Sequence, residues 1–370
     1  MLTRFSPLST LGGLLRRPPV AASAPVQPPD DADTPLRPEA ALPVHVAAEH
    51  GEVRIEDGLL TLWTEQEERT LRLDEVSLLA LHGNITITTP CLHELMRRGI
   101  PVLFHTRGGY YLGQLADASA NASRVRRAQY AVAADPRRAL HVSRQLVEAK
   151  LLNARRLLRR RGVRKAELRR FGRLLRKARK ARSADRLRGI EGAAAALYWS
   201  LWPGLIRAGH EMFVFEGRTR RPPRDAVNAA LSYAYAVLTG ACSAAALGAG
   251  LDPHVGFYHA ERAGRPALAL DMLEPFRPMV ADTAMLQAIN SGDLNEECFS
   301  RQDDGAVLLS ETGRRAVLGA LERRLSTHFA YPGTGRDMSW RSAISLHAQL
   351  LARALCSGET GFAQPVLPGS

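Results

Sequence analysis

The spacing of apolar residues changes near residue 119, and this change restricts the chain to a mixed fold. Between about 43 and 118, short runs such as Val53–Ile55 and Leu59–Trp63 alternate with a period of two and are separated by turn residues. After 119, apolar residues recur every three or four positions, as from Leu140 to Leu152. The first pattern indicates strands and the second indicates helices. We therefore expect an α+β fold, with a small N-terminal β-rich domain followed by a larger all-helical domain.

The ends of the chain differ in composition from its middle. Residues 1–42 are rich in proline and contain no aromatic residue after Phe5, which is typical of a disordered tail or linker. Such a tail would be left from an upstream fusion or from an early start codon. We expect four parts, which are a disordered Pro-rich segment at 1–42, the β-rich domain at 43–118, the helical domain at 119–357 and a loose C-terminal tail at 358–370.

Composition also indicates where the protein works. The four cysteines, Cys91, Cys242, Cys298 and Cys356, are far apart and form no C-x-x-C pair, which favours a reducing compartment and the cytoplasm. No run of eighteen apolar residues occurs, so no transmembrane helix and no membrane partner are expected. The segment from Ala226 to Gly250 is apolar nearly all round, which predicts a central, buried helix with Asp225 as its N-cap.

The positive charge of the chain is concentrated in one segment. Residues 124–190 contain 24 Lys or Arg residues against four acids, whereas the net charge of the whole 370-residue chain is only +13. A block of this size attracts polyanions and favours counterion release from nucleic acid. A solvated helix face is the structural alternative, and a membrane surface is a weaker one. We interpret the segment as a nucleic-acid-binding surface.

A histidine and three carboxylates stand in apolar surroundings and are the candidate site. His259 ends the run Gly256–His259, Asp271 and Glu274 lie in the run Leu270–Pro278, and Glu191 opens a separate apolar segment. Buried carboxylates are costly unless they are paired, hydrogen-bonded or bound to a metal. Two Glu and one His that converge would suit a divalent cation. The alternatives are a structural histidine, a Glu191 that complements a helix dipole in the first turn, and a partly solvated Asp271–Glu274 pair.

Five stretches in a fixed order carry a resemblance to a known family. They are Leu81–Ile87, Glu191–Ala194, Arg220–Ala229, Gly256–His259 and Leu268–Pro278. Over about residues 43–355, the chain resembles the CRISPR-associated integrase-endonuclease that captures spacers, the first of the numbered Cas proteins. The resemblance implies an N-terminal β-rich domain joined to an all-helical catalytic domain. It also implies that Glu191, His259 and Glu274 bind Mg²⁺ or Mn²⁺, with Asp271 close by as a supporting or catalytic group.

The resemblance also implies an activity and its partners. The activity is CRISPR adaptation, in which a metal-dependent endonuclease and integrase inserts a new spacer beside a CRISPR repeat. The partners are double-stranded DNA (the spacer precursor and the repeat), a second copy in a homodimer, and a companion small subunit, the second numbered Cas protein, in a heterohexamer. Some members are fused to a RecB-like exonuclease or to a reverse transcriptase, so residues 1–42 would be the remnant of such a linker.

The reaction needs groups that hold phosphate, and arginines near the candidate ligands are suited to this task. Arg220, Arg221 and Arg277 are our candidates, and the alternatives for each of them are general contact with the DNA backbone or an intramolecular ion pair. Two other functions remain open from the sequence. One is a catalytically silent DNA-binding scaffold, and the other is a structure-selective nuclease that acts in repair.

Overall fold

A computed structural model describes residues 41–115, 122–207, 211–219, 222–332, 337–359, 361–362 and 364–366. By its contacts the chain divides into Met1–Pro35 and Leu36–Ser370, and all the described residues belong to the second unit. Apart from Ala41 and Leu42, the tail expected at 1–42 lies outside the described residues. The domain limits expected from the sequence remain predictions.

The N-terminal part is a six-stranded sheet with the order β3-β2-β1-β4-β5-β6. The strands are β1 (Leu42–Glu56), β2 (Leu59–Thr64), β3 (Glu68–Leu71), β4 (Val76–Ile87), β5 (Val102–His105) and β6 (Tyr111–Leu115). Strand β1 is antiparallel to β2 and parallel to β4. The hairpin between β1 and β2 turns at Asp57 and Gly58, whose φ angles are 50° and 77°. An Asp-Gly pair adopts such left-handed angles readily, which explains why the strand pattern stops there.

The two faces of the sheet have different partners. Helix α1 (Thr89–Arg97) packs Cys91 and Leu95 into the same core as Val53 and Leu79. Its N-cap is Thr88, because Thr89 already has helical geometry and Pro90 occupies the first turn. The opposite face of the sheet carries two buried histidines, and strands β5 and β6 contact helix α6 there.

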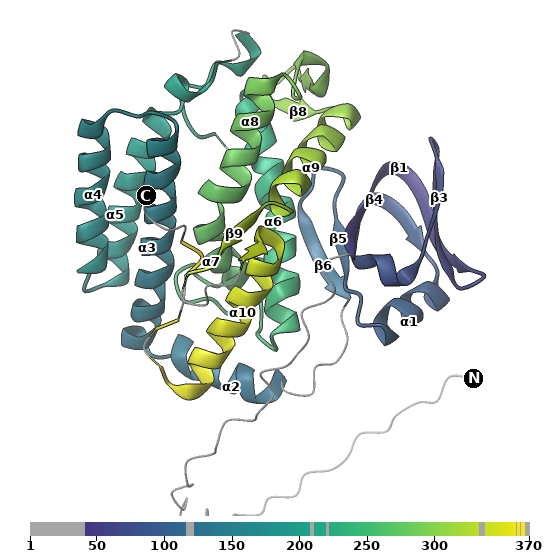
Figure 1. Cartoon of the computed structure of the whole chain (residues 1–370), viewed down its shortest axis with the longest axis horizontal. Coiled ribbons are helices and arrows are strands. Elements are labelled where there is room, and N and C mark those ends of the chain that lie inside the picture. The colour runs from purple at the N-terminus through teal and green to yellow at the C-terminus, as the bar shows by residue number, and fades with distance from the viewer. Residues whose placement is uncertain are drawn as a thin grey trace, which may run out of the picture. The chain divides into compact units, whose positions relative to one another are not determined.

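The rest of the described chain is mainly helical (Figure 1). Its helices are α2 (Ala122–Ala133), α3 (Pro136–Arg160), α4 (Lys165–Arg179), α5 (Ala184–Ser200), α6 (Ala226–Gly248), α7 (Ala267–Phe276), α8 (Thr283–Ser291), α9 (Glu311–Leu325) and α10 (Trp340–Ser357). The expected α+β class with an N-terminal sheet and a helical region is therefore confirmed. The expectation that the second part is all-helical is only roughly right, because it also contains two small antiparallel sheets. These pair β7 (Phe299–Arg301) with β8 (Val307–Leu309), and β9 (His328–Ala330) with β10 (Asp337–Ser339).

Helix α6 is the central helix that its composition predicts. The Asp225 side chain caps it by accepting the Asn228 backbone N–H at 2.7 Å. The helix is long and apolar enough to cross a membrane by length and composition, and 67% of its apolar window is buried inside the structure. Its contacts with α7, α9 and α10 show that this apolar surface packs against other helices. The helix thus forms the centre of a helical core.

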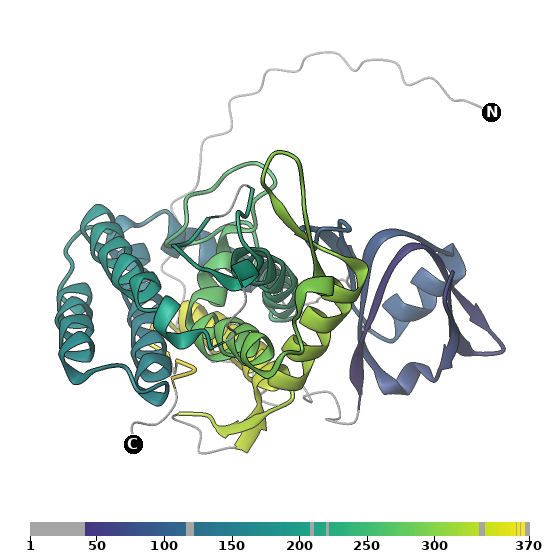
Figure 2. The same ribbon diagram turned by 90° about the horizontal axis from the view of Figure 1, so that it is seen from above.

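Helices α3, α4 and α5 lie side by side in both views (Figures 1 and 2). The first turn of α3 contains Pro136, and the Asp135 carboxylate caps it by accepting the Arg137 N–H at 2.8 Å. Helix α3 then ends before Gly162, whose φ of 79° lets the chain reverse into α4. Helix α3 also packs against α7, so the bundle adjoins the helix that carries two of the candidate carboxylates.

Candidate active site

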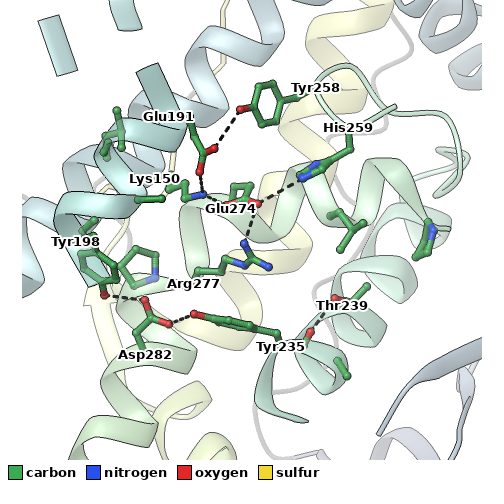
Figure 3. A pocket seen from close by; sticks show the side chains of 18 of the residues that line it. Lys150, Glu191, Tyr198, Tyr235, Thr239, Tyr258, His259, Glu274, Arg277 and Asp282 are labelled. Atoms are coloured by element: carbon green, nitrogen blue, oxygen red, sulfur yellow. Dashed lines mark hydrogen bonds and ion pairs between the residues drawn. The ribbon is translucent and has the colours of Figure 1, made fainter. Parts of the chain in front are cut away.

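Two helices and one loop bring Glu191, His259 and Glu274 together (Figure 3). Glu191 comes from α5, Asp271 and Glu274 come from α7, and His259 comes from the loop before α7. Glu191 lies in the middle of α5 because Ser183 caps this helix eight residues earlier, accepting the Arg186 N–H. The alternative of a Glu191 in the first helical turn is therefore wrong. Glu274 is 3% exposed and Asp271 is fully buried.

Asp271 fixes the orientation of His259. Its Oδ2 accepts the backbone N–H groups of Phe257 at 2.6 Å and Tyr258 at 2.9 Å, and its Oδ1 lies 2.7 Å from His259 Nδ1. An ionised carboxylate only accepts hydrogen bonds, so Nδ1 is the donor, and in the neutral imidazole Nε2 keeps its lone pair. Nε2 lies 3.7 Å from Glu274 Oε1. The imidazole therefore places Nε2, an atom that can bind a metal ion, on the side that faces the Glu274 carboxylate.

Gly256 permits this close approach of the loop to α7. A Cβ atom at position 256 would lie 2.9 Å from both the Ala267 carbonyl carbon and Asp271 Oδ2. Both distances are shorter than a normal carbon contact, and the first involves backbone that cannot move aside. Glycine is thus needed for Asp271 to reach the backbone N–H groups of Phe257, Tyr258 and His259.

Glu274 is held ionised by two cations. Arg277 Nη1 lies 3.0 Å from Oε1, and Lys150 Nζ lies 2.7 Å from Oε2. Burial alone would raise the pKa of the Glu274 carboxyl, but the charges of Arg277 and Lys150 outweigh burial and lower that pKa to about 2. The Lys150 contact lacks hydrogen-bond geometry, so Oε2 has a neighbouring charge without a directed hydrogen bond.

Lys150 is a residue of the site that the sequence analysis missed. Its ammonium group bridges the two carboxylates, because Nζ also lies 2.5 Å from Glu191 Oε1. A signal for it exists in the sequence, since Lys150 follows Leu146 and Val147 at helical spacing and precedes the buried Ala154. A lysine on the buried face of a helix needs a partner. Because this segment contains so many basic residues, one lysine on the buried face of the helix does not stand out in the sequence.

The three predicted arginines have different outcomes. Arg277 lies in the intramolecular ion pair with Glu274, and its guanidinium also stacks over the Tyr235 ring at 4.4 Å from the centroid. Arg220 and Arg221 lie outside the described residues. Phosphate contacts by the three arginines therefore remain predictions, and Arg277 has the structural role that was one of the alternatives for it.

A third buried carboxylate, Asp282, lines a cavity together with Glu274, and the sequence analysis missed it as well. It accepts hydrogen bonds from the hydroxyls of Tyr198, at 2.7 Å, and Tyr235. Burial raises the pKa of Asp282 to about 6, although both hydroxyls oppose the change. The cavity has a volume of about 630 Å³ and is also lined by Glu191, Lys150, His259 and Glu274. It is large enough to admit a small part of a larger substrate.

The donor atoms suit a hard divalent cation. Two carboxylates and one imidazole nitrogen with a free lone pair are ligands that Mg²⁺ and Mn²⁺ accept. Glu274 Oε2, which has no directed hydrogen bond, provides a buried oxygen for this purpose. As they stand, no three His, Cys, Asp or Glu side chains within the described ranges are arranged to hold an ion. At this site the Lys150 ammonium lies between Glu191 and Glu274.

Comparison with known proteins assigns the family. Residues 44–323 match the family described as "CRISPR associated protein Cas1", so the chain belongs to the Cas1 family and the resemblance drawn from its motifs is confirmed. It is 31% identical to a CRISPR-associated endonuclease Cas1 of Moorella thermoacetica, over 85% of this chain and 94% of that protein. The structure is similar to that of a Cas1 protein from Thermotoga maritima, with a TM-score of 0.74, 25% identity, and coverage of 88% of this chain and 99% of that one.

A longer relative is more similar in sequence than the Moorella thermoacetica protein. The chain is 43% identical over 322 residues to a CRISPR-associated exonuclease Cas4/endonuclease Cas1 fusion of Rhodospirillum rubrum. The match covers 85% of this chain but 55% of that protein, so the chain spans just over half the length of this relative.

Proposed function

We propose that the chain acts in CRISPR adaptation as a metal-dependent DNA endonuclease and integrase that inserts new spacers into the repeat array. The observation that carries the proposal is the meeting of Glu191, His259 and Glu274 at one cavity in a chain of the Cas1 family. The relative from Moorella thermoacetica, which matches along nearly its whole length, is named an endonuclease, and this name supports the nuclease part.

The cofactor that we propose is Mg²⁺ or Mn²⁺, held by Glu191, Glu274 and Nε2 of His259. Such a cation polarises a phosphoryl oxygen and lowers the pKa of an attacking hydroxyl. Asp271 keeps the Nδ1 proton of His259 in place, so that Nε2 stays available as a ligand. Arg277 keeps Glu274 ionised and at a fixed position beside the imidazole.

The reaction that we propose is an exchange of phosphodiesters. The 3′ hydroxyl of the spacer precursor attacks a phosphate at the border of the repeat. One P–O bond forms and one breaks, and the proton of the attacking hydroxyl is balanced by protonation of the released 3′ oxygen. Because the two phosphodiesters are equivalent in kind, the exchange needs no external energy source.

The proposed partners are double-stranded DNA, a second copy of the chain, and the companion subunit Cas2 in a heterohexamer. DNA binding is supported by the exposed basic residues of α4, among them Arg173, Arg176 and Lys177. Such residues would hold the phosphate backbone without reading bases. Arg220 and Arg221 remain proposed phosphate contacts.

The test is strand transfer by site variants. We expect Glu191→Gln and His259→Ala to lower Mn²⁺-dependent strand transfer into a repeat-containing plasmid at least about 100-fold, since losing even an outer partner of a metal ligand costs about 10- to 100-fold. Salt-sensitive DNA binding should persist in both variants. Glu148→Gln is the control, because Glu148 is a carboxylate of α3 that pairs with Arg179 instead of lining the cavity. Full strand transfer by either site variant would refute the proposed site.

The same assay separates the two alternative functions. A catalytically silent scaffold would bind DNA without any strand transfer by the unaltered protein. A structure-selective repair nuclease would cut branched duplexes at this site and leave the repeat-containing plasmid unmodified.

A further inference from the structure

We propose that Lys150 is a built-in counter-cation, which holds Glu191 and Glu274 together in the metal-free protein and leaves its place between them when a divalent cation binds. This inference rests on the proposed function, because it concerns the same two carboxylates. It assigns Lys150 a positioning role and makes this residue a determinant of the affinity of the site for the cation.

The first argument is electrostatic. Glu191 and Glu274 both have an oxygen within 2.7 Å of one ammonium nitrogen, so the two carboxylates are close neighbours. Two carboxylates at such a separation repel each other, and burial of Glu274 strengthens the repulsion. A cation between them is therefore required if both stay ionised. Lys150 provides it in the protein alone (Figure 3).

The second argument is that two cations beside Glu274 differ in their freedom to move. The Arg277 guanidinium is fixed, because it pairs with Glu274 Oε1 and stacks over the Tyr235 ring. Lys150 has a flexible four-carbon stem and a compact charge, and its contact with Glu274 Oε2 lacks hydrogen-bond geometry. The side chain also lines the cavity of about 630 Å³, which gives its ammonium group space to move into. Lys150 is thus the replaceable cation and Arg277 the permanent one.

The third argument comes from the donor atoms. The oxygens that contact Lys150 are Glu191 Oε1 and Glu274 Oε2, one from each predicted carboxylate ligand. A divalent cation that uses these oxygens competes directly with the ammonium group. The competition is mutual, so whatever stabilises Lys150 in its place weakens binding of the cation.

The test uses the full-length chain and Mn²⁺ alone as the probe. Lys150→Met removes the charge at nearly constant length, and Lys165→Met, at an exposed position of α4, is the matched control. Free Mn²⁺ is counted by electron paramagnetic resonance, and melting is followed with and without Mn²⁺. We expect the Kd for Mn²⁺ to fall at least about fivefold in Lys150→Met, within the usual range of coupling between two sites. We also expect its metal-free Tm to drop and its Tm increase on Mn²⁺ addition to exceed that of the control.

The outcomes separate this inference from the proposed function. If Glu191→Gln removes Mn²⁺ binding but Lys150→Met binds no more tightly than the control, the inference is overturned and the metal site stands. If Glu191→Gln binds Mn²⁺ like the unaltered protein, both are overturned. Should Lys150→Met be unfolded without metal, Mn²⁺ must restore a cooperative melting transition, and failure to do so overturns the inference.

Discussion

At the scale of single residues, Tyr235 connects the buried Asp282 to the charged site. Its hydroxyl donates to Asp282, while its ring lies beneath the Arg277 guanidinium, which pairs with Glu274. Tyr198 donates to the same carboxylate at 2.7 Å, but the described contacts of its ring are with Trp199 and Trp202. Both tyrosines therefore donate one hydrogen bond to Asp282, but of the two only Tyr235 also contacts the Arg277 guanidinium.

This difference predicts unequal effects of two similar changes. Tyr235→Phe and Tyr198→Phe each remove one hydrogen bond to a buried carboxylate, which should destabilise the protein by about 1–3 kcal/mol. We expect similar decreases in Tm for both variants. The Mn²⁺-dependent cleavage of DNA should fall more in Tyr235→Phe, because the ring that carries Arg277 is no longer anchored. Equal losses of cleavage in the two variants would show that Tyr235 has only a structural role.

At the scale of elements, helix α4 has one apolar face and one basic face. Its buried residues Leu168, Phe171, Leu175 and Ala178 recur at three and four positions and face the bundle. Arg173, Arg176 and Lys177 are exposed between them. Because the apolar face already packs against α3 and α5, the basic face is the one available to a partner.

For this face we predict a uniform loss of DNA affinity when its charges are removed. The variant Arg173→Gln, Arg176→Gln, Lys177→Gln should bind all DNA sequences more weakly. The slope of log K against log salt should fall by up to about 2.7, or about 0.9 for each phosphate that the variant no longer neutralises. The control removes three basic residues that pair with acidic neighbours, Arg72 directly after β3 and Arg97 and Arg98 at the end of α1. A loss confined to one DNA sequence would contradict a role in phosphate binding.

At the scale of the whole described unit, three stacked histidines join the sheet to the helices. The rings of His45, His82 and His105 lie on β1, β4 and β5, with centroids 5.2 Å and 4.6 Å apart in that order. His45 Nε2 lies 3.2 Å from the Glu322 carboxylate of α9. A Cβ atom at Gly240 of α6 would lie 2.6 Å from His105 Nε2, so the helix approaches the ring closely. The junction is tight and leaves no room for an added hydration shell.

This junction predicts a loss of stability in mild acid. Burial, together with the charge of His45, lowers the pKa of His105 to about 4, below its usual value of 6.5. Between those two values the unfolded chain binds a proton that the folded chain does not bind. The stability that the neutral, buried His105 contributes is therefore fully present above pH 6.5. This contribution decreases as the pH falls toward 4, by on the order of 3 kcal/mol.

The measurement is melting as a function of pH. His105→Phe keeps an aromatic ring beside Gly240 and removes the titrating group, so its Tm should decrease less between pH 6.5 and 4 than the Tm of the unaltered protein. His93→Phe, at an exposed position of α1, is the control and should keep the full pH dependence. An unchanged pH dependence in His105→Phe would show that His105 does not contribute to it. His82 faces the same ring, and its pKa is also lowered, mainly by burial, so some dependence should persist.

Much of the fold follows from interactions between residues near in sequence. The period-two runs predicted strands on either side of the turn that joins β1 and β2, and Asp225 predicted the start of α6, because turns and caps involve neighbouring residues. No local pattern indicated that β1 begins at Leu42 and runs through Glu56, since its first half is completed by parallel pairing with β4. The extra strands β7 to β10 were missed because each has only three residues, too few for a period to show.

The features of the candidate site also fall into those that the sequence determines and those that depend on tertiary packing. The sequence by itself determined the residue types and, through the family motifs, the proposed ligand set Glu191, His259 and Glu274. Only the tertiary structure decided that Lys150 lies between the two carboxylates and that Arg277 is committed to an ion pair. The reason is that such partners come from α3, α5 and α7, and the packing of whole helices sets their distances. A local pattern carries no information on which buried charge will find which partner.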